Sequence, residues 1–150
     1  MRIWPATCCA VLIAWSGAAH AQEAAAPAAS AVKVESYYRI RWGELPTFLD
    51  LYRKNHQPLL NHMQELGLIT AAHMQEPYTH LTGEGRWDVR VTITYRDADA
   101  ALFGKEIAAQ WHAAQTSLYP DAARFRKEEK TRFDVVEEHW DVVVIDVGSP

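Results

Sequence analysis

The chain has 150 residues, of which 49% are hydrophobic and 23% are charged, which fits one globular domain and excludes a wholly disordered protein. Its formal net charge of -4 excludes a nucleic-acid binder that works through a basic surface, so no nucleic-acid partner is expected. The only long apolar run lies at the N-terminus, so we expect no membrane-spanning segment in the remainder of the chain.

The N-terminal segment has the pattern of an export signal. A positive charge near the N-terminus precedes an apolar run over residues 3–15, and the segment ends with the small residues Ala19 and Ala21. Signal peptidase requires small side chains at these two positions before the cleaved bond. The sequence therefore predicts a signal peptide over residues 1–21, which is removed, and a periplasmic or secreted protein.

A flexible linker and one folded domain are expected after the cleavage site. Residues 22–31 are rich in Ala and contain Pro, which is typical of a linker, and the predicted domain covers residues 32–150. Both cysteines, Cys8 and Cys9, belong to the signal peptide. The mature domain would therefore have no disulfide, no thiolate nucleophile and no cysteine metal ligand.

The first two elements of the domain are a strand and a long helix. Apolar residues alternate with polar ones over residues 32–42, which predicts a half-buried strand. They then recur every three or four residues over residues 45–66, which predicts a helix with one apolar stripe. Pro58 lies inside this helix and lacks the N–H that would bond the carbonyl of Lys54, so we expect a kink near residues 55–57.

Four more elements complete the predicted domain. They are a short strand over residues 68–75, a strand over residues 87–95, a helix from the N-cap Asp97 to about Gln115 that is followed by a charged helical segment over residues 120–130, and a strand over residues 133–147. The last strand is apolar on both alternations from Val142 onward, except at Asp146, so we expect cover on both of its faces. This order predicts an α+β, ferredoxin-like βαββαβ fold with an antiparallel sheet.

Three segments carry a resemblance to a known superfamily: residues 37–41, residues 52–59 and residues 85–88. With the element order, they resemble the dimeric α+β barrel superfamily over residues 32–147, and the chain is similar to its NIPSNAP-type and monooxygenase-type members. The resemblance implies a homodimer in which two sheets pair into a barrel whose lumen can hold a small molecule. Because the fold serves enzymes, stress proteins and binding modules, it does not select a function.

The polar alternations of the strands supply candidate ligand-binding residues. If the helices cover the face of the sheet that carries the apolar side chains, the polar side chains share the other face. We place Glu137, His139 and Asp141 of the last strand on that second face too. A partner sheet would turn this face into a lumen whose arginines bind an anionic or carbonyl ligand. A solvated sheet face or a structural ion-pair network is the alternative. The predicted ligand-binding residues are Tyr37, Arg39, Arg41, Asp88 and Arg90.

His56 and His139 are the candidate catalytic residues. A histidine with a pKa near neutrality serves as a general acid or base. His56 belongs to the apolar stripe of the long helix, one turn from Tyr52 and beside the expected kink. In the alternative interpretation His56 is structural, and its imidazole bonds the region of the Lys54 carbonyl.

Three functional hypotheses follow. The histidines lack the spacing of a helical metal site and no HExxH pattern is present, so neither a metal nor another cofactor is expected. The leading hypothesis is an exported homodimer that binds a small anionic or carbonyl-containing molecule in its lumen. The second is a cofactor-independent oxygenase or isomerase in which His56 or His139 acts with lumen arginines on an enolate or phenolate. The third is a structural dimer without a ligand.

Overall fold

The computed structural model describes residues 30–79 and 81–145. The predicted signal peptide, most of the predicted linker and the last five residues of the chain lie outside this range. Within the described residues, no helix has the length and apolar character that a membrane crossing requires.

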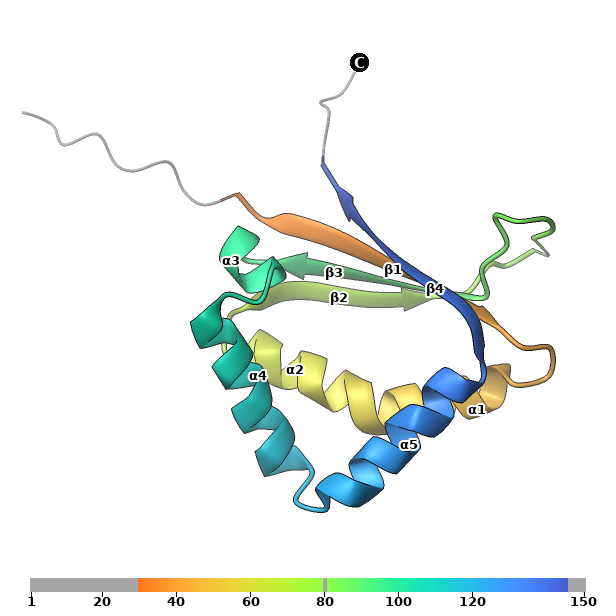
Figure 1. Ribbon diagram of the computed structural model, residues 1–150. Coiled ribbons are helices and arrows are strands. Elements are labelled where there is room, and N and C mark those ends of the chain that lie inside the picture. The colour runs from red at the N-terminus through yellow and green to blue at the C-terminus, as the bar shows by residue number, and fades with distance from the viewer. Residues whose placement is uncertain (1–29, 80, 146–150) are drawn as a thin grey trace, which may run out of the picture.

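Four antiparallel strands form one sheet (Figure 1). They are β1 (Val32–Ile40), β2 (Ile69–Gln75), β3 (Val89–Tyr95) and β4 (Val136–Val144). The order across the sheet is β2-β3-β1-β4, so β1 is central and β4 is an edge strand. This arrangement confirms the expected α+β, ferredoxin-like class.

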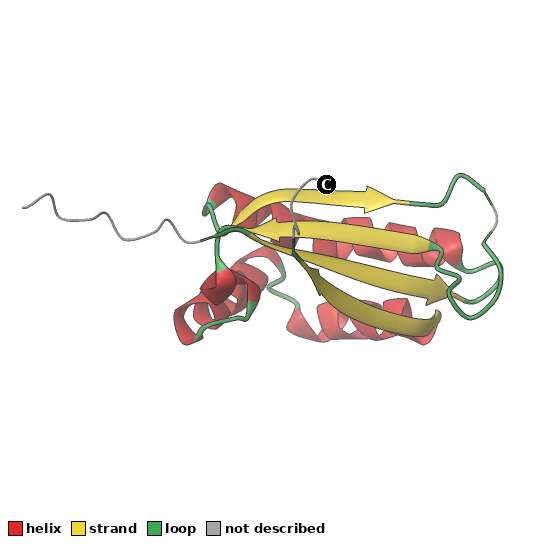
Figure 2. Cartoon of the chain, turned by 90° about the horizontal axis from the view of Figure 1, so that it is seen from above, coloured by secondary structure: helices red, strands yellow, loops and turns green. Residues whose placement is uncertain are grey.

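The main helices lie on one face of the sheet (Figures 1 and 2). The helical elements are α1 (Leu45–Leu51), the π-helical turn η1 (Tyr52–His56), α2 (Gln57–Glu65), the short α3 (Ala98–Ala101), α4 (Lys105–Leu118) and α5 (Ala122–Asp134). Between this layer and the sheet lie the most deeply buried apolar side chains, which include Tyr52, Phe48, Ile40, Met63, Ile69, Val89 and Val91. Among residues 30–79 and 81–145, no helix covers the other face of the sheet.

The predicted kink is the π-helical turn η1. Pro58 has no N–H to continue the ordinary pattern of helical hydrogen bonds. The chain adapts over residues 52–56 by a wider turn, in which the N–H of Gln57 donates to the carbonyl of Tyr52, five residues earlier. The apolar stripe of the long helix therefore continues past Pro58. The segments α1, η1 and α2 follow one another directly, with no loop between them.

The hydroxyl of Tyr119 stabilises this turn from outside the helix. It donates to the carbonyl oxygen of Asn55 at 2.7 Å and lies 3.2 Å from that of Lys54. In the alternative interpretation the imidazole of His56 bonds this region; among the described residues the side-chain donor to these carbonyls is Tyr119. The ring of His56 is therefore free to face elsewhere.

The helix predicted to run from Asp97 to Gln115 is instead two helices. The Asp97 carboxylate caps α3 by accepting the N–H of Ala100 at 2.8 Å. The chain then turns at Phe103, whose φ is +53°, a conformation rare for residues with a side chain. At Gly104 the backbone lies so close to Asp99 that a Cβ would overlap the carboxylate. The turn interrupts a helix that periodicity alone makes continuous.

The ends of the outer strands also differ from the prediction. The first strand stops at Ile40, and Trp42 lies in the following turn with 90% of its surface exposed. The last strand begins at Val136, because the chain is still helical at Phe133. Val142 and Val143 remain 41% and 58% exposed, so this chain does not itself cover both faces of β4.

Candidate functional site

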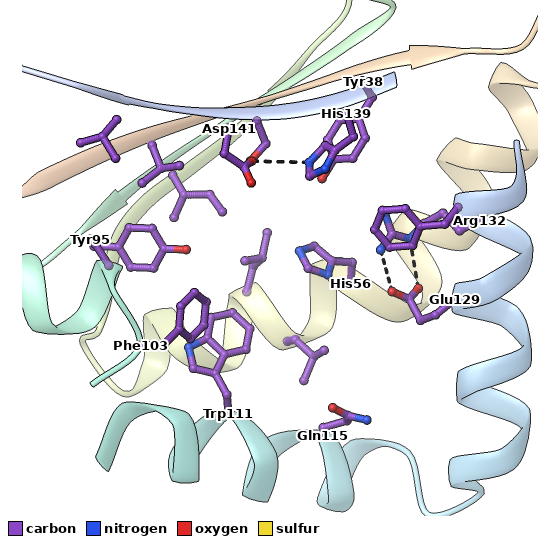
Figure 3. Close-up of a pocket in the computed structure, with 18 of the residues that line it drawn as sticks. Tyr38, His56, Tyr95, Phe103, Trp111, Gln115, Glu129, Arg132, His139 and Asp141 are labelled. Atoms are coloured by element: carbon purple, nitrogen blue, oxygen red, sulfur yellow. Dashed lines mark hydrogen bonds and ion pairs between the residues drawn. The ribbon is translucent and has the colours of Figure 1, made fainter. Parts of the chain in front are cut away.

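A cavity of about 640 Å³ lies between the sheet and the helices, and it is partly open to solvent. Figure 3 shows side chains from both layers pointing into it. Most of its lining surface is apolar, although about half of the lining residues carry a polar group. This combination is usual for pockets that bind small organic molecules. The polar side chains around the cavity are Ser36, Tyr38, His56, Tyr95, Gln115, Glu129, Arg132, His139 and Asp141.

The register of the sheet brings His139 and Asp141 into this cavity. In the pairing of β1 with β4, Tyr38 is opposite His139 and Ser36 is opposite Asp141. Placing these two residues on the far face with Tyr37 is therefore wrong. The error has a physical cause: β4 is an edge strand that borders a cavity, so its helix-facing residues are polar.

His56 ends η1 and points into the cavity from the helical layer (Figure 3). It is half-buried, and its ring packs 4.9 Å from that of Tyr52. Burial, followed by the positive charge of Arg132, lowers the pKa of His56 to about 4. At neutral pH the imidazole is thus uncharged, and it is a weaker base than an ordinary histidine.

His139 faces the same cavity from the sheet. Its ring stacks on Tyr38 with 4.4 Å between ring centroids, and its Nε2 lies 3.4 Å from the Asp141 carboxylate. Burial lowers the pKa of His139, an effect that Asp141 opposes and Arg132 reinforces. Ser36 donates to Asp141 at 2.5 Å and so holds the carboxylate at this place. The structure therefore brings the two candidate catalytic histidines to one cavity.

A buried ion pair on α5 borders the cavity beside His56. Arg132 is 2% exposed and binds Glu129 through two contacts, Nε to Oε1 at 3.1 Å and Nη2 to Oε2 at 2.6 Å. Burial opposes the charge of Arg132, but Glu129 outweighs this and raises its pKa. Its guanidinium also lies over the rings of Phe48 and Tyr52. Arg132 is thus a fixed positive charge at the cavity wall.

Arg132 retains an unused hydrogen-bond donor. Within the described residues, its buried Nη1 has no hydrogen-bond partner. Of the two charges in the pair, Arg132 affects the pKa of His56 more strongly than Glu129 does. The surroundings of His56 are therefore electropositive, and a negative charge that develops there is stabilised.

The sequence-based prediction missed Arg132 and Glu129. The signal was the spacing of Phe125, Glu129 and Arg132, which are four and three residues apart and so share one face of a helix. Two opposite charges on the helix face that also carries an apolar side chain indicate a buried ion pair. Tyr95 and Trp111 belong to a strand and a helix that the sequence predicts, but no local pattern reveals that they border a cavity.

Tyr37 and Arg90 meet on the sheet face opposite the helices. They are directly paired between β1 and β3, and Arg90 also lies 5.5 Å from the ring of Trp87 and 2.7 Å from the Gln75 side chain. Arg39 lies on the same strand as Tyr37, where it forms ion pairs with Glu137 and Glu138.

The other two predicted ligand-binding residues have different surroundings. Asp88 accepts the N–H of Ile40 at 2.7 Å and forms an ion pair with Arg86 at 3.0 Å, so it holds the end of β1. Arg41 follows the end of β1 and is exposed. The described residues contain no group of three or more histidine, cysteine or acidic side chains placed to hold a metal ion.

Comparison with known proteins supports the fold. No family model matches the chain, and no curated protein matches it in sequence. A hypothetical protein from Arabidopsis thaliana has a similar structure, with a TM-score of 0.53, 12% identity, and coverage of 82% of this chain and 94% of that one. A dimeric ferredoxin-like protein from an uncultured marine organism gives a TM-score of 0.52, 10% identity, and coverage of 81% and 94%.

Solved structures of the NIPSNAP and monooxygenase types are also among those similar to this chain, as the sequence resemblance implied. A NIPSNAP family protein from Agrobacterium tumefaciens is 17% identical, with a TM-score of 0.46 and coverage of 79% of this chain and 88% of that chain. At such identities the likeness concerns the fold alone.

The lowered pKa of His56 predicts a loss of stability in acid. The unfolded chain protonates this histidine near its ordinary pKa of 6.5, whereas the folded chain does so only near 4. Between these values the unfolded state binds more protons, so the free energy of unfolding falls as the pH decreases. We expect His56→Gln to remove about 2–3 kcal/mol of this fall, measured by urea unfolding between pH 7 and pH 4.

His112→Gln is the matched control, since His112 is exposed on α4. This variant should keep the pH dependence of the unmodified protein. An unchanged pH dependence in His56→Gln would show that His56 is not buried as a neutral imidazole.

Proposed function

We propose that this protein binds a small, mostly apolar molecule with an enolisable carbonyl or an acidic hydroxyl in the cavity between sheet and helices, where His56 accepts a proton from it. One observation carries the proposal: an uncharged His56 and a buried, incompletely bonded Arg132 border the same apolar cavity. A base and a fixed positive charge at one cavity are the groups that proton abstraction next to a carbonyl requires.

The proposed chemistry divides the work between these two residues. His56 takes the proton from the carbon beside the carbonyl, and the electron pair of the broken C–H bond moves to form an enolate. The negative charge that develops on the oxygen is stabilised by the electropositive surroundings that Arg132 creates. An isomerase returns the proton to another atom, whereas a cofactor-independent oxygenase passes electrons from the enolate to dioxygen.

The predicted signal peptide supports an exported, periplasmic or secreted protein.

We also propose that the chain is a homodimer whose second copy covers the sheet face without helices. A similar solved protein is dimeric, and on this face Tyr37 stacks on Trp140 with 5.3 Å between ring centroids. Tyr37 also packs edge-on against Trp87. Aromatic side chains of this kind are enriched at protein interfaces.

A lumen between two copies is the second candidate site, because Tyr37, Arg39 and Arg90 would face it. Their ion pairs with glutamates lie within this chain, which favours the structural interpretation of these charges. The two candidate sites lie on opposite faces of one sheet. Variants can therefore separate them.

Exchange of a carbon-bound proton with solvent tests the proposed function. The probe is 2-tetralone, an enolisable ketone, in heavy water, and exchange of the protons beside its carbonyl is followed by NMR. We expect the protein to accelerate exchange, and we expect His56→Gln to reduce the acceleration about 100-fold or more, because a positioned base typically contributes that much. The affinity for 2-naphthol, which has the planar shape of an enol, should change by less than about threefold in His56→Gln.

Arg90→Met is the matched control, because Arg90 lies on the other face of the sheet. It should leave both exchange and 2-naphthol binding unchanged. Loss of binding in Arg90→Met with full retention in His56→Gln would place the ligand in a dimer lumen and overturn the cavity proposal.

The dimer proposal is tested at the aromatic stack. Trp140→Lys places a charge where the second copy is expected, so the variant should be a monomer at micromolar concentration while the unmodified chain is a dimer. Size-exclusion chromatography with light scattering measures both masses. A monomeric unmodified chain would remove the lumen.

A further inference from the structure

Tyr95 is a buried residue whose hydroxyl group the proposed proton transfer does not use. It is the last residue of β3, only 6% of its surface is exposed, and its hydroxyl points into the cavity (Figure 3). No hydrogen bond to that hydroxyl occurs among the described residues. In Figure 3, His56 lies between Tyr95 on one side of the cavity and Arg132 on the other.

The cavity is partly open to solvent, so this hydroxyl is available to water and to a ligand that displaces that water. Tyr95 stays protonated at neutral pH, because burial and then the charge of Asp141 raise its pKa to about 12. It therefore offers one O–H donor and an acceptor oxygen to whatever occupies the cavity. Asp141, which borders the same cavity, offers acceptors only.

We propose that Tyr95 and Asp141 form a second polar subsite of the cavity, which selects ligands with a hydroxyl or amino group at the end away from Arg132. This inference rests on the proposed function, since it concerns the same cavity. The ligand class that fits is an apolar body with two polar ends: an enolisable carbonyl or acidic hydroxyl at His56, and a neutral hydroxyl or an amine at Tyr95.

The chemistry of the two residues explains this selectivity. A ligand hydroxyl donates to the carboxylate of Asp141 and accepts from Tyr95, so both groups are bonded. A ligand carbonyl satisfies Tyr95 alone, and a ligand carboxylate is repelled by Asp141. Ser36 already donates to one oxygen of that carboxylate, which fixes its direction.

The experiment compares 2-naphthol with naphthalene-2,6-diol and naphthalene-2,7-diol by fluorescence titration of the unmodified protein, Tyr95→Phe and Asp141→Asn. At least one diol should bind the unmodified protein about three- to tenfold more tightly than 2-naphthol, beyond the roughly twofold statistical gain of two equivalent hydroxyls. Tyr95→Phe should abolish that gain and change 2-naphthol affinity by less than about twofold. Asp141→Asn should reduce the gain.

Asp50→Asn, on the exposed surface of α1, controls for the loss of one negative charge and should keep the gain. Thermal melting of Tyr95→Phe verifies its fold. If 2-naphthol binds but neither diol binds more tightly, or the gain persists in Tyr95→Phe, the subsite is wrong and the proposed function stands. If none of the three compounds binds the unmodified protein, the proposed function fails, and the subsite fails with it.

Discussion

The ion pair of Arg132 with Glu129 is the interaction on which the candidate site depends. A buried arginine without a partner would destabilise the fold by several kcal/mol, so Glu129 must remain beside it. The guanidinium lies over Phe48 and Tyr52, and it therefore joins α5 to the first helical segment. Burial keeps His56 neutral, and the positive charge of Arg132 adds to this effect. The guanidinium of Arg132 thus contributes both to the packing of the helical layer and to the proposed reactivity of the cavity.

The backbone around His56 departs from regular α-helical structure. Pro58 interrupts the helical hydrogen bonds, the π-helical turn absorbs the interruption, and Tyr119 bonds a carbonyl of that turn. Such turns are frequent at functional sites. Here the turn ends at the residue that we propose as the base, and a hydroxyl from another segment keeps its backbone in place. The imidazole packs against Tyr52 and points into the cavity.

Local patterns predicted the order of the elements along the chain, the fold class and the kink, because alternation, helical periodicity and a proline act within a few residues. They did not predict the break at Phe103, since its φ of +53° arises where the chain passes close to Asp99. The face of His139 was assigned wrongly, because polarity was taken to mean the outer side of the sheet, whereas this edge strand borders a cavity. The spacing of Glu129 and Arg132 places them on one face of a helix, but the burial of Arg132 depends on its contacts with Phe48 and Tyr52, which that spacing does not specify.

The most direct test of the central claim is the pKa of His56, measured by NMR of its ring nitrogens with and without saturating 2-naphthol. The account predicts a value near 4 in the free protein. It also predicts a further fall when 2-naphthol binds, because the ligand displaces water from the ring and its hydroxyl donates to the neutral imidazole. A pKa near the ordinary value in the free protein, or one that 2-naphthol binding leaves unchanged, would contradict the claim that this cavity holds the ligand against a neutral base.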